Sequence, residues 1–400
     1  MQKFAPKLNF KVFYGTKKSL DTNCHVVLTT YGVMTRAADK EFAKVNFRLC
    51  IIDEAQAIKN SKTANFKKIK KINADCRIAM SGTPVENRLA EYWSIKDFVN
   101  PGLLGSESDF KRDYANPIEK HRDASAVDKF RRITAPFVMR RLKSDKSIID
   151  DLPEKISTNQ YCSLSKSQAA LYQSKVNSAL HRLENDEVNR LALVLEMIIS
   201  LKQICNCPQT FELDDKDFDP AMIDPQDTGK SESLFALLDE MIDAGQKAII
   251  FTQFTKMGEL LKYWCHKRYS MDVDFYHGGL GQKEKSRIVD TFQNDRSKKI
   301  LILSLRAAGT GLNLTAATNV IHYDLWWNPA VENQATDRAY RIGQKHNVNV
   351  YRLICTNTFE EKINEIIQSK KELTELTVNA GENWIGDLSN RQLKELFSVE

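Results

Sequence analysis

Eight short apolar runs, each closed by a polar or glycine-containing turn, limit what this chain can fold into more than any other feature. The runs are apolar throughout rather than alternating, which is typical of strands buried on both faces of a parallel sheet. Helical patterns lie between them, for example at 282–293 and 330–341, and such strand–helix alternation predicts α/β units. The runs form two groups, which predict two α/β lobes: 26–30, 48–53 and 76–82, then 247–254, 273–279, 299–305, 319–324 and 348–355.

Composition is that of an ordinary globular protein with two or three domains. The chain has 400 residues, 42% apolar and 28% charged, which excludes disordered, collagen-like and disulfide-rich classes. A net charge of +6 is compatible with nucleic-acid binding but is too small to indicate it. The eight cysteines show no zinc-binding spacing and are typical of reduced thiols. The amino terminus lacks a signal-peptide core, and the apolar stretch at 191–201 is broken by Glu196, so we expect a soluble, intracellular protein.

The segment at 86–228 has a different pattern and separates the two groups. Ser165-x-x-Gln168 is a capping-box signal that opens a helical pattern running through Leu201. Residues 212–228 are acidic and carry two prolines, which predicts a loop. A second capping-box signal, Ser389-x-x-Gln392, precedes apolar residues in the tail.

The strongest local signal is a pair of adjacent carboxylates, Asp53 and Glu54, at the carboxyl end of the predicted strand at 48–53. Ligands bind at the carboxyl ends of strands in open α/β sheets. In nucleotide hydrolases the first such carboxylate holds Mg²⁺ and the second can polarise the attacking water. The alternative for Asp-Glu alone is a strand that ends in a solvated acidic turn. The string Ser81-Gly82-Thr83-Pro84 follows the next predicted strand, 28 residues after Asp53.

The second group of strands carries two further signals. The stretch from Ser304 to Asn313 is a predicted strand running into a glycine-containing loop, and such loops present N–H groups to phosphate oxygens. Gln334, Arg338 and Arg341 fall on one predicted helical face. The arginines suit the neutralisation of charge in a phosphoryl-transfer transition state, and the alternative is a solvated basic face.

A phosphate-binding loop is not recognisable in this sequence. Gly229-Lys230-Ser231 resembles the end of one, but the required first glycine is Asp224 and no apolar strand precedes it. We therefore predict that this string is not a nucleotide site. Basic clusters at 59–71 and 131–143 are either solvated faces or contacts to a phosphate backbone.

Taken together, the strings of this sequence resemble the Swi/Snf family of DNA-dependent ATPases, the duplex-translocating branch of the superfamily-two helicases. The resemblance covers essentially the whole chain and is closest to compact bacterial-type members. It implies an α/β fold with two RecA-like parallel-sheet lobes, the first incomplete, and helical insertions of the Swi/Snf type. The strings that carry it, in family order, are TTYGVM, IIDEAQAIKN, SGTPVENRLAEYW, NPGLLGS, PFVMRRLKSDK, DLPEK, LKQICNCP, IIFTQFT, YHGG, LSLRAAGTGLNLTAATNVIHYDLWWNPAVENQATDRAYRIGQ and WIGDLSNRQLKELF.

The resemblance also implies a domain organisation. The first half is expected to hold the carboxyl-terminal portion of lobe one with motifs II and III (1–85), a helical insertion (86–135) and a linker (136–155). The second half is expected to hold the start of lobe two with a helical insertion and an acidic loop (156–228), RecA-like lobe two with motifs IV to VI (229–370) and a carboxyl-terminal tail or brace (371–400).

Residue roles follow from the same resemblance. Asp53 matches the Mg²⁺-associated carboxylate of motif II, Glu54 matches its catalytic base, and Arg338 and Arg341 match the arginine fingers of motif VI. The other matched positions are Gly309, Gly311 and Gln334 for ATP, Gln56, Ser81, Gly82 and Thr83 for coupling, and Thr29, Thr30, Gln253, His277, Gly278, Ser304 and Asn313 for DNA. Cys205 and Cys207 lie in an insertion motif, where a metal role is a minor alternative.

The implied activity is ATP-dependent translocation on duplex DNA, with ATP and Mg²⁺ as cofactors and with a DNA-bound protein as the remodelling target. The implied location is cytoplasmic, on the nucleoid in a bacterium and in the nucleus in a eukaryote. Because family members begin lobe one with the phosphate loop, we expect this chain to be the carboxyl-terminal part of a translocase. The alternative is an inactive fragment that only binds DNA or a partner.

Overall fold

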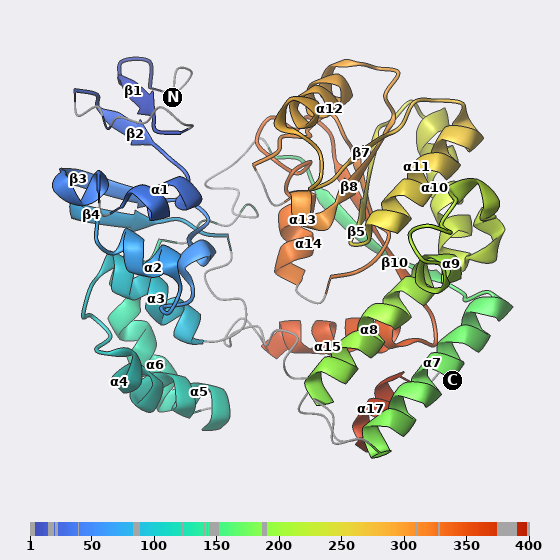
Figure 1. The fold of residues 1–400 in the computed structure, drawn as a ribbon, viewed down its shortest axis with the longest axis horizontal. Coiled ribbons are helices and arrows are strands. Elements are labelled where there is room, and N and C mark those ends of the chain that lie inside the picture. The colour runs from blue at the N-terminus through green and yellow to red at the C-terminus, as the bar shows by residue number, and fades with distance from the viewer. Residues whose placement is uncertain are drawn as a thin grey trace. The chain divides into compact units, whose positions relative to one another are not determined.

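The structure is a computed structural model, and it describes residues 5–14, 20, 23–38, 40–82, 89–121, 123–139, 141, 143, 152–185, 190–308, 311–326, 329–373 and 390–397. The chain divides into two compact units, the first made mainly of residues 1–140 and the second mainly of residues 141–400 (Figure 1). No helix among the described residues has the length and apolar character needed to cross a bilayer.

The first unit contains two short parallel sheets. One pairs β1 (Phe10–Val12) with β2 (Val26–Leu28), and the other pairs β3 (Asn46–Ile52) with β4 (Asn73–Ala79). Helices α1 (Tyr31–Ala37) and α2 (Ala64–Ile69) supply Met34, Phe66 and Ile69 to the core under β3. The opposite face of the second sheet carries Leu49 and Ile51, which remain exposed.

A helical module completes the first unit. It consists of α3 (Leu89–Val99), α4 (Glu107–Phe110), α5 (Asn116–His121) and α6 (Ala124–Thr134). Together with the π-helical segment Lys111–Ala115, these helices bury an aromatic cluster that contains Trp93, Phe110 and Tyr114. The module occupies most of the segment predicted as a helical insertion.

The second unit is built on one parallel sheet of six strands in the order β5-β10-β9-β6-β8-β7. The strands are β5 (Lys155–Cys162), β6 (Ala248–Thr252), β7 (Asp274–Tyr276), β8 (Ile300–Ser304), β9 (Asn319–His322) and β10 (Val348–Cys355). The central strands β6, β8 and β9 are buried almost throughout, as their continuous apolar runs predict. The predicted α/β fold with a parallel sheet is thus confirmed.

Helices cover both faces of this sheet (Figure 1). Helices α10 (Gly229–Asp243) and α11 (Thr255–Tyr269) pack against side chains such as Ile250 and Ile302. On the other face, α12 (Gln282–Asn294), α13 (Leu305–Ala308) and α14 (Pro329–Thr336) cover Ile249 and Leu301. A further layer contains α7 (Lys166–Asn185), α8 (Arg190–Asn206), α9 (Pro208–Glu212), α15 (Phe359–Leu373) and α17 (Asn390–Phe397).

The capping box at Ser165 is present, but the helical pattern it opens forms two helices and not one. The N–H of Gln168 donates to Ser165 Oγ over 3.2 Å, and the N–H of Ser165 donates to Gln168 Oε1 over 3.0 Å. Helix α7 ends at Asn185 and α8 begins at Arg190. The division lets the apolar faces of both helices bury in one core, to which Val176 of α7 and Val194 of α8 both belong.

The helix predicted at 330–341 is shorter than expected, since α14 ends at Thr336. The carbonyl of Arg338 accepts a hydrogen bond from the N–H of Leu314 over 2.9 Å, which draws the backbone out of the helical path. Arg338 and Arg341 therefore lie on a bend and do not share a helical face. The prediction of an i, i+3 pair on one face was wrong.

Candidate functional site

Motif II begins where β3 ends, as the sequence predicts. Asp53 is exposed, and its Oδ1 accepts the N–H of Glu54 over 2.9 Å. The Tyr31 hydroxyl donates to the carbonyl oxygen of Asp53 over 2.8 Å. Partial burial, together with the charge of Asp53, raises the pKa of the Tyr31 phenol, which therefore stays a donor at neutral pH. These contacts fix the backbone that carries the carboxylate pair.

Glu54 has a left-handed backbone conformation, with φ of 50°. Such a conformation is uncommon for a residue with a side chain, and it clusters at functional sites. It turns the chain sharply from the strand into the 3₁₀ turn at Ala55–Ile58. The turn places the side chain of Glu54 next to that of Gln56.

A continuous hydrogen-bonded chain joins motif II to motif III. Gln56 Nε2 donates to Glu54 Oε2 over 2.7 Å, and Ser81 Oγ donates to Gln56 Oε1 over 2.9 Å. Ser81 reaches this position because β4 continues the pairing with β3, with the N–H of Met80 donating to the carbonyl of Ile52. The pairing of neighbouring parallel strands thus brings together residues that the sequence separates. Gly82 is exposed beside Ser81, and Thr83 lies outside the described residues.

The predicted DNA-contacting threonines, Thr29 and Thr30, are both exposed, and both side chains have structural partners. Thr29 Oγ1 donates to the carbonyl of Phe13 over 3.0 Å. Thr30 caps helix α1 by accepting the N–H of Val33 over 3.4 Å. The DNA role of both remains a prediction.

In the second unit, Gln253 follows β6 and is held by a buried carboxylate. Its N–H donates to Asp324 Oδ1 over 2.9 Å, and its Nε2 donates to the carbonyl of Leu325 over 2.7 Å. Asp324 also accepts from Thr252 Oγ1 and Asn206 Nδ2, and burial raises the pKa of this carboxyl. Asp324 was not singled out from the sequence, although it is the last residue of the predicted strand at 319–324.

Two other predicted DNA-contacting residues lie in the turn after β7. The imidazole of His277 stacks on Phe275 with ring centroids 4.9 Å apart, and its Nδ1 accepts the N–H of Gly279 over 3.3 Å. Gly278 is exposed, and its carbonyl accepts from Lys285 Nζ over 3.1 Å. The turn is therefore held by helix α12, which contains Lys285.

Motifs V and VI lie next to each other within the second unit. Arg341 is exposed, and its Nη1 donates to the carbonyl of Leu312 in motif V over 3.1 Å. Ser304 ends β8 and is half-buried, whereas Gly311, at φ of 47°, and Asn313 are exposed. Gln334 is half-buried on α14, Arg338 is 8% exposed, and Gly309 lies outside the described residues.

Gln344 holds motifs V and VI together and was missed by sequence reasoning. Its Nε2 lies within 3.2 Å of the carbonyl oxygens of Thr315, Ala317 and Ala339. Its Oε1 accepts the N–H groups of the two residues that follow it. The string RIGQ carries it, but only the three-dimensional contacts show that the glutamine is a backbone clamp.

The Gly229-Lys230-Ser231 string is structural, in agreement with its rejection as a phosphate loop. Lys230 is fully buried, and its Nζ donates to Glu360 over 2.8 Å and to Asn206 Oδ1 over 3.1 Å. Burial acts to lower the pKa of Lys230, but the charge of Glu360, smaller contributions from Cys355 and Cys205 and the hydrogen bond to Glu360 together leave the pKa raised. The ammonium group of Lys230 therefore forms a buried ion pair with Glu360.

Cys205, Cys355 and Glu360 have potential ligand atoms within 4.8 Å of one another. Glu360 is already paired with Lys230, and burial raises the pKa of the Cys355 thiol well above its usual value. Cys207 is not part of this group, and its Sγ donates to Gln209 Oε1. These features suit buried, protonated thiols better than a metal centre.

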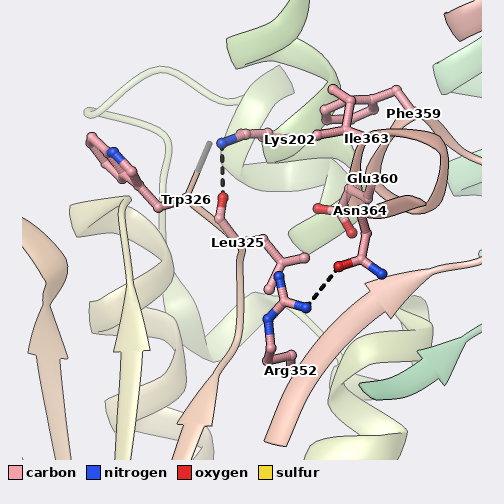
Figure 2. Close-up of a pocket in the computed structure, with 8 residues that line it drawn as sticks. All are labelled: Lys202, Leu325, Trp326, Arg352, Phe359, Glu360, Ile363 and Asn364. Atoms are coloured by element: carbon pink, nitrogen blue, oxygen red, sulfur yellow. Dashed lines mark hydrogen bonds between the residues drawn. The ribbon is translucent and has the colours of Figure 1, made fainter. Parts of the chain in front are cut away.

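A cavity of about 20 Å³ lies beside this network, lined mainly by apolar atoms (Figure 2). Lys202 Nζ donates to the carbonyl of Leu325 over 2.9 Å, and Arg352 Nη1 donates to Asn364 Oδ1 over 2.7 Å. A space of this size holds about one water molecule. It is therefore a packing defect of the core and not a substrate site.

The strand-end carboxylates of the first unit and the arginine-bearing bend of the second are the features of a helicase-like ATPase. Residues 1–210 match the SNF2-related domain, and residues 229–343 match the helicase conserved C-terminal domain. The chain belongs to the SNF2 family.

Relatives and solved structures agree with this assignment. The chain is 41% identical to YwqA of Bacillus subtilis over 407 residues, which cover 100% of this chain and 43% of YwqA. It is 34% identical to the DNA repair and recombination protein RAD26 of Saccharomyces cerevisiae, over 86% of this chain and 32% of RAD26. Less than half the length of each of these curated relatives is thus matched.

The structure is similar to the Sulfolobus solfataricus SWI2/SNF2 ATPase core solved in complex with dsDNA. The TM-score is 0.55 at 39% identity, over 100% of this chain and 83% of that chain. The C-terminal domain of the same ATPase matches 62% of this chain and all of its own length, with a TM-score of 0.52 at 34% identity.

Proposed function

We propose that this chain is the catalytic-core portion of an ATP-driven translocase that moves along duplex DNA and remodels proteins bound to it. The observation that carries the proposal is the hydrogen-bonded chain from Glu54 through Gln56 to Ser81. Through it, a change in what the motif II carboxylates bind alters the hydrogen bonding of motif III. A link of this kind is what coupling of hydrolysis to movement requires.

The chemistry follows from the carboxylate pair. Asp53 is exposed and presents a hard oxygen donor of the kind Mg²⁺ takes, most often through water. When bound with ATP, the metal would neutralise charge on the β- and γ-phosphate oxygens. Glu54 would orient and polarise the attacking water, and Arg338 and Arg341 would stabilise the charge of the transition state.

Duplex DNA as the partner is supported by the Sulfolobus ATPase core, which was solved with dsDNA. The predicted contacts are sequence-independent, because they come from hydroxyl, amide and backbone groups suited to phosphate oxygens. Gln253 donates its amide N–H to Leu325, so we expect its role near DNA to be mainly that of shaping the strand end. Thr29, Thr30, His277 and Asn313 remain the more direct contacts of this proposal.

The test is ATP hydrolysis by a hybrid protein in which the phosphate-loop region of a family member precedes this chain. Duplex DNA should raise the rate of hydrolysis, and Ser81→Ala should remove that stimulation while leaving the DNA-independent rate. Ser108→Ala removes an exposed hydroxyl elsewhere in the first unit and serves as the matched control. A hybrid that hydrolyses ATP at one rate with and without DNA would argue for an inactive, binding-only role.

A further inference from the structure

Lys143, which lies in the linker predicted at 136–155, contacts the arginine-bearing bend of the second unit. Its Nζ lies 2.9 Å from Asp337 Oδ1 and donates to the carbonyl oxygen of Tyr340 over 2.9 Å. The same Nζ lies 5.5 Å from the centroid of the Tyr340 ring. All three residues belong to the second unit, so these contacts lie within one compact body.

The two partners of Lys143 are the chain neighbours of the two arginines. Asp337 directly precedes Arg338, and Tyr340 directly precedes Arg341. Carbonyl groups at and beyond a helix end lack a partner within the helix, and Lys143 supplies one for Tyr340, beyond the end of α14. An ammonium group with a contact next to each arginine fixes the backbone at both positions.

The bend is also held by a second segment of the chain. The N–H of Leu314, which follows motif V, donates to the carbonyl of Arg338 over 2.9 Å. The side-chain amide of Gln344 donates to the carbonyl of Ala339 over 3.2 Å. Lys143 contacts the bend from the linker, so two separate segments determine where the bend lies.

The ion pair between Lys143 and Asp337 is partly exposed, with 36% and 38% of the two side chains accessible. Ion pairs at such sites are screened by solvent and contribute little to the stability of a folded protein. Replacement of Lys143 should therefore leave the second unit folded. The contact instead provides a fixed geometry, because one ammonium group is bonded to both a carboxylate and a carbonyl of the bend.

The sequence allows the basic cluster at 131–143 to be a contact to a phosphate backbone. Lys143 is poorly suited to that role, because Asp337 offsets the positive charge that would attract a phosphate. Its ammonium group also donates to the carbonyl of Tyr340, which leaves fewer protons for another acceptor. The contacts of Lys143 therefore favour a role within the second unit over a role in DNA binding.

We propose that Lys143 is a positioning residue for ATP hydrolysis, which holds the bend so that Arg338 and Arg341 reach the charge of the transition state. This role rests on the proposed function, since the function of the two arginines belongs to it. Catalytic groups act within narrow geometric limits, and a displacement of about 1 Å can lower a rate about 10²-fold. Lys143 thus affects hydrolysis through the arginines and not by contact with the nucleotide.

The first test measures ATP hydrolysis by the hybrid protein over a range of ATP concentrations at saturating duplex DNA. Lys143→Met should lower kcat about tenfold or more. It should leave KM for ATP within about twofold of the parent, since placement of the arginines matters in the transition state. Lys143→Arg keeps a cationic donor and should retain most of the rate. Lys262→Met removes a lysine charge from an exposed position on α11 and should behave as the parent.

A double-mutant cycle shows whether the effect passes through Asp337. Asp337→Asn removes the negative charge but keeps the size of the side chain, and it should also lower kcat. If the two residues act through one contact, Lys143→Met combined with Asp337→Asn should lower kcat no further than Lys143→Met alone. Losses that multiply in the double variant would show that Lys143 acts through another group and would contradict the proposal.

Fluorine NMR of the 400-residue chain tests the contact separately from hydrolysis. The chain has 12 tyrosines, so the resonance of 3-fluorotyrosine at position 340 can be assigned with Tyr340→Phe. Lys143→Met should shift this resonance, because the ammonium group beside the ring is lost, whereas Lys262→Met should not. Circular dichroism checks that both variants are folded.

The outcomes separate this role from the proposed function. An unchanged kcat in Lys143→Met, a loss of rate that more duplex DNA restores, or an unchanged Tyr340 resonance would overturn the role of Lys143 and leave the proposed function standing. A parent hybrid without DNA-stimulated hydrolysis would refute the proposed function, and the role of Lys143 together with it.

Discussion

At the scale of single residues, Glu54 combines a left-handed backbone with a side chain hydrogen-bonded to Gln56. In the hybrid protein, Glu54→Gln should lower the rate of ATP hydrolysis by about 10²- to 10⁴-fold, the usual contribution of a general base, while ATP binding persists because Asp53 remains. Glu41→Gln changes an exposed carboxylate of the same unit and is the control. If the Glu54→Gln variant hydrolyses ATP at a rate within a few-fold of the parent, roughly the scatter of such assays, Glu54 is not the general base.

His322 leads to a prediction for the pH dependence of stability. Its pKa is lowered from 6.5 to about 3 in the folded protein by burial and by Arg352 and Lys155. Between these two values the unfolded chain binds a proton that the folded chain does not, so stability falls as the pH drops. The slope for one such group reaches about 1.4 kcal/mol per pH unit.

Urea unfolding of the second unit at several pH values checks this prediction. Burial raises the pKa of Asp324 and Glu332, and those shifts act in the opposite direction. The comparison must therefore be made between the parent and His322→Asn at each pH. The variant should lose the part of the acid sensitivity that lies between pH 6.5 and 3, and parallel curves for the two proteins would contradict the assignment.

The sequence predicted some of these residues well and could not predict others. Asp53, Glu54 and Ser81 end predicted strands, so their meeting at one sheet edge follows from the rules of parallel sheets. The roles of Asp324, Gln344 and His322 depend on partners far along the chain, such as Asn206 for Asp324. No local pattern signals such partners, because they are set by packing.

At the scale of elements, the buried pair Lys230–Glu360 joins α10 to α15. Glu360→Gln should destabilise the second unit by about 3–5 kcal/mol, since it leaves an ammonium buried without its counter-charge. The double variant Lys230→Met with Glu360→Leu should recover much of that loss. Chemical unfolding of the parent and the two variants measures these free energies of unfolding. If Glu360→Gln is nearly as stable as the parent, the pair is accessible to water.

The strands were predictable from the sequence to a larger extent than the helix ends. Each of the eight apolar runs overlaps an observed strand, namely β2 to β4 and β6 to β10. β5 was missed because KISTNQYC is mostly polar, and it forms a strand only by pairing along its whole length with β10. The early end of α14 was also missed, since it depends on the long-range hydrogen bond from Leu314 to Arg338.

At the scale of the whole molecule, the two units differ in how completely their sheets are covered. In the first unit, Leu49 and Ile51 of β3 are 45% and 53% exposed, and Ile78 and Met80 lie exposed on the same face. In the second unit, strands β6, β8 and β9 are buried on both faces by helices, whereas the edge strand β5 exposes Ile156 and Tyr161. Complete burial of one aliphatic side chain stabilises a fold by roughly 1.5–3 kcal/mol. The exposed side chains of the first unit therefore leave its free energy of unfolding lower by several kcal/mol than full burial would give.

Limited proteolysis of the 400-residue chain tests this difference. We expect a resistant fragment that contains 247–355 and early cleavage near Asp53, because cleavage follows the population of locally opened chain. Two proteases of different specificity control for the distribution of cleavage sites. Equal protection of both regions would show that the first unit is stable despite its exposed face.

Movement along duplex DNA is the central claim, and displacement of a third strand from a triplex measures it most directly. The hybrid protein is mixed with a duplex that carries a labelled triplex-forming strand at one end, and release of that strand is followed with ATP. The account predicts ATP-dependent release by the parent and none by Glu54→Gln, although both bind the duplex. Release without ATP, or no release from a hybrid that hydrolyses ATP in response to DNA, would contradict it.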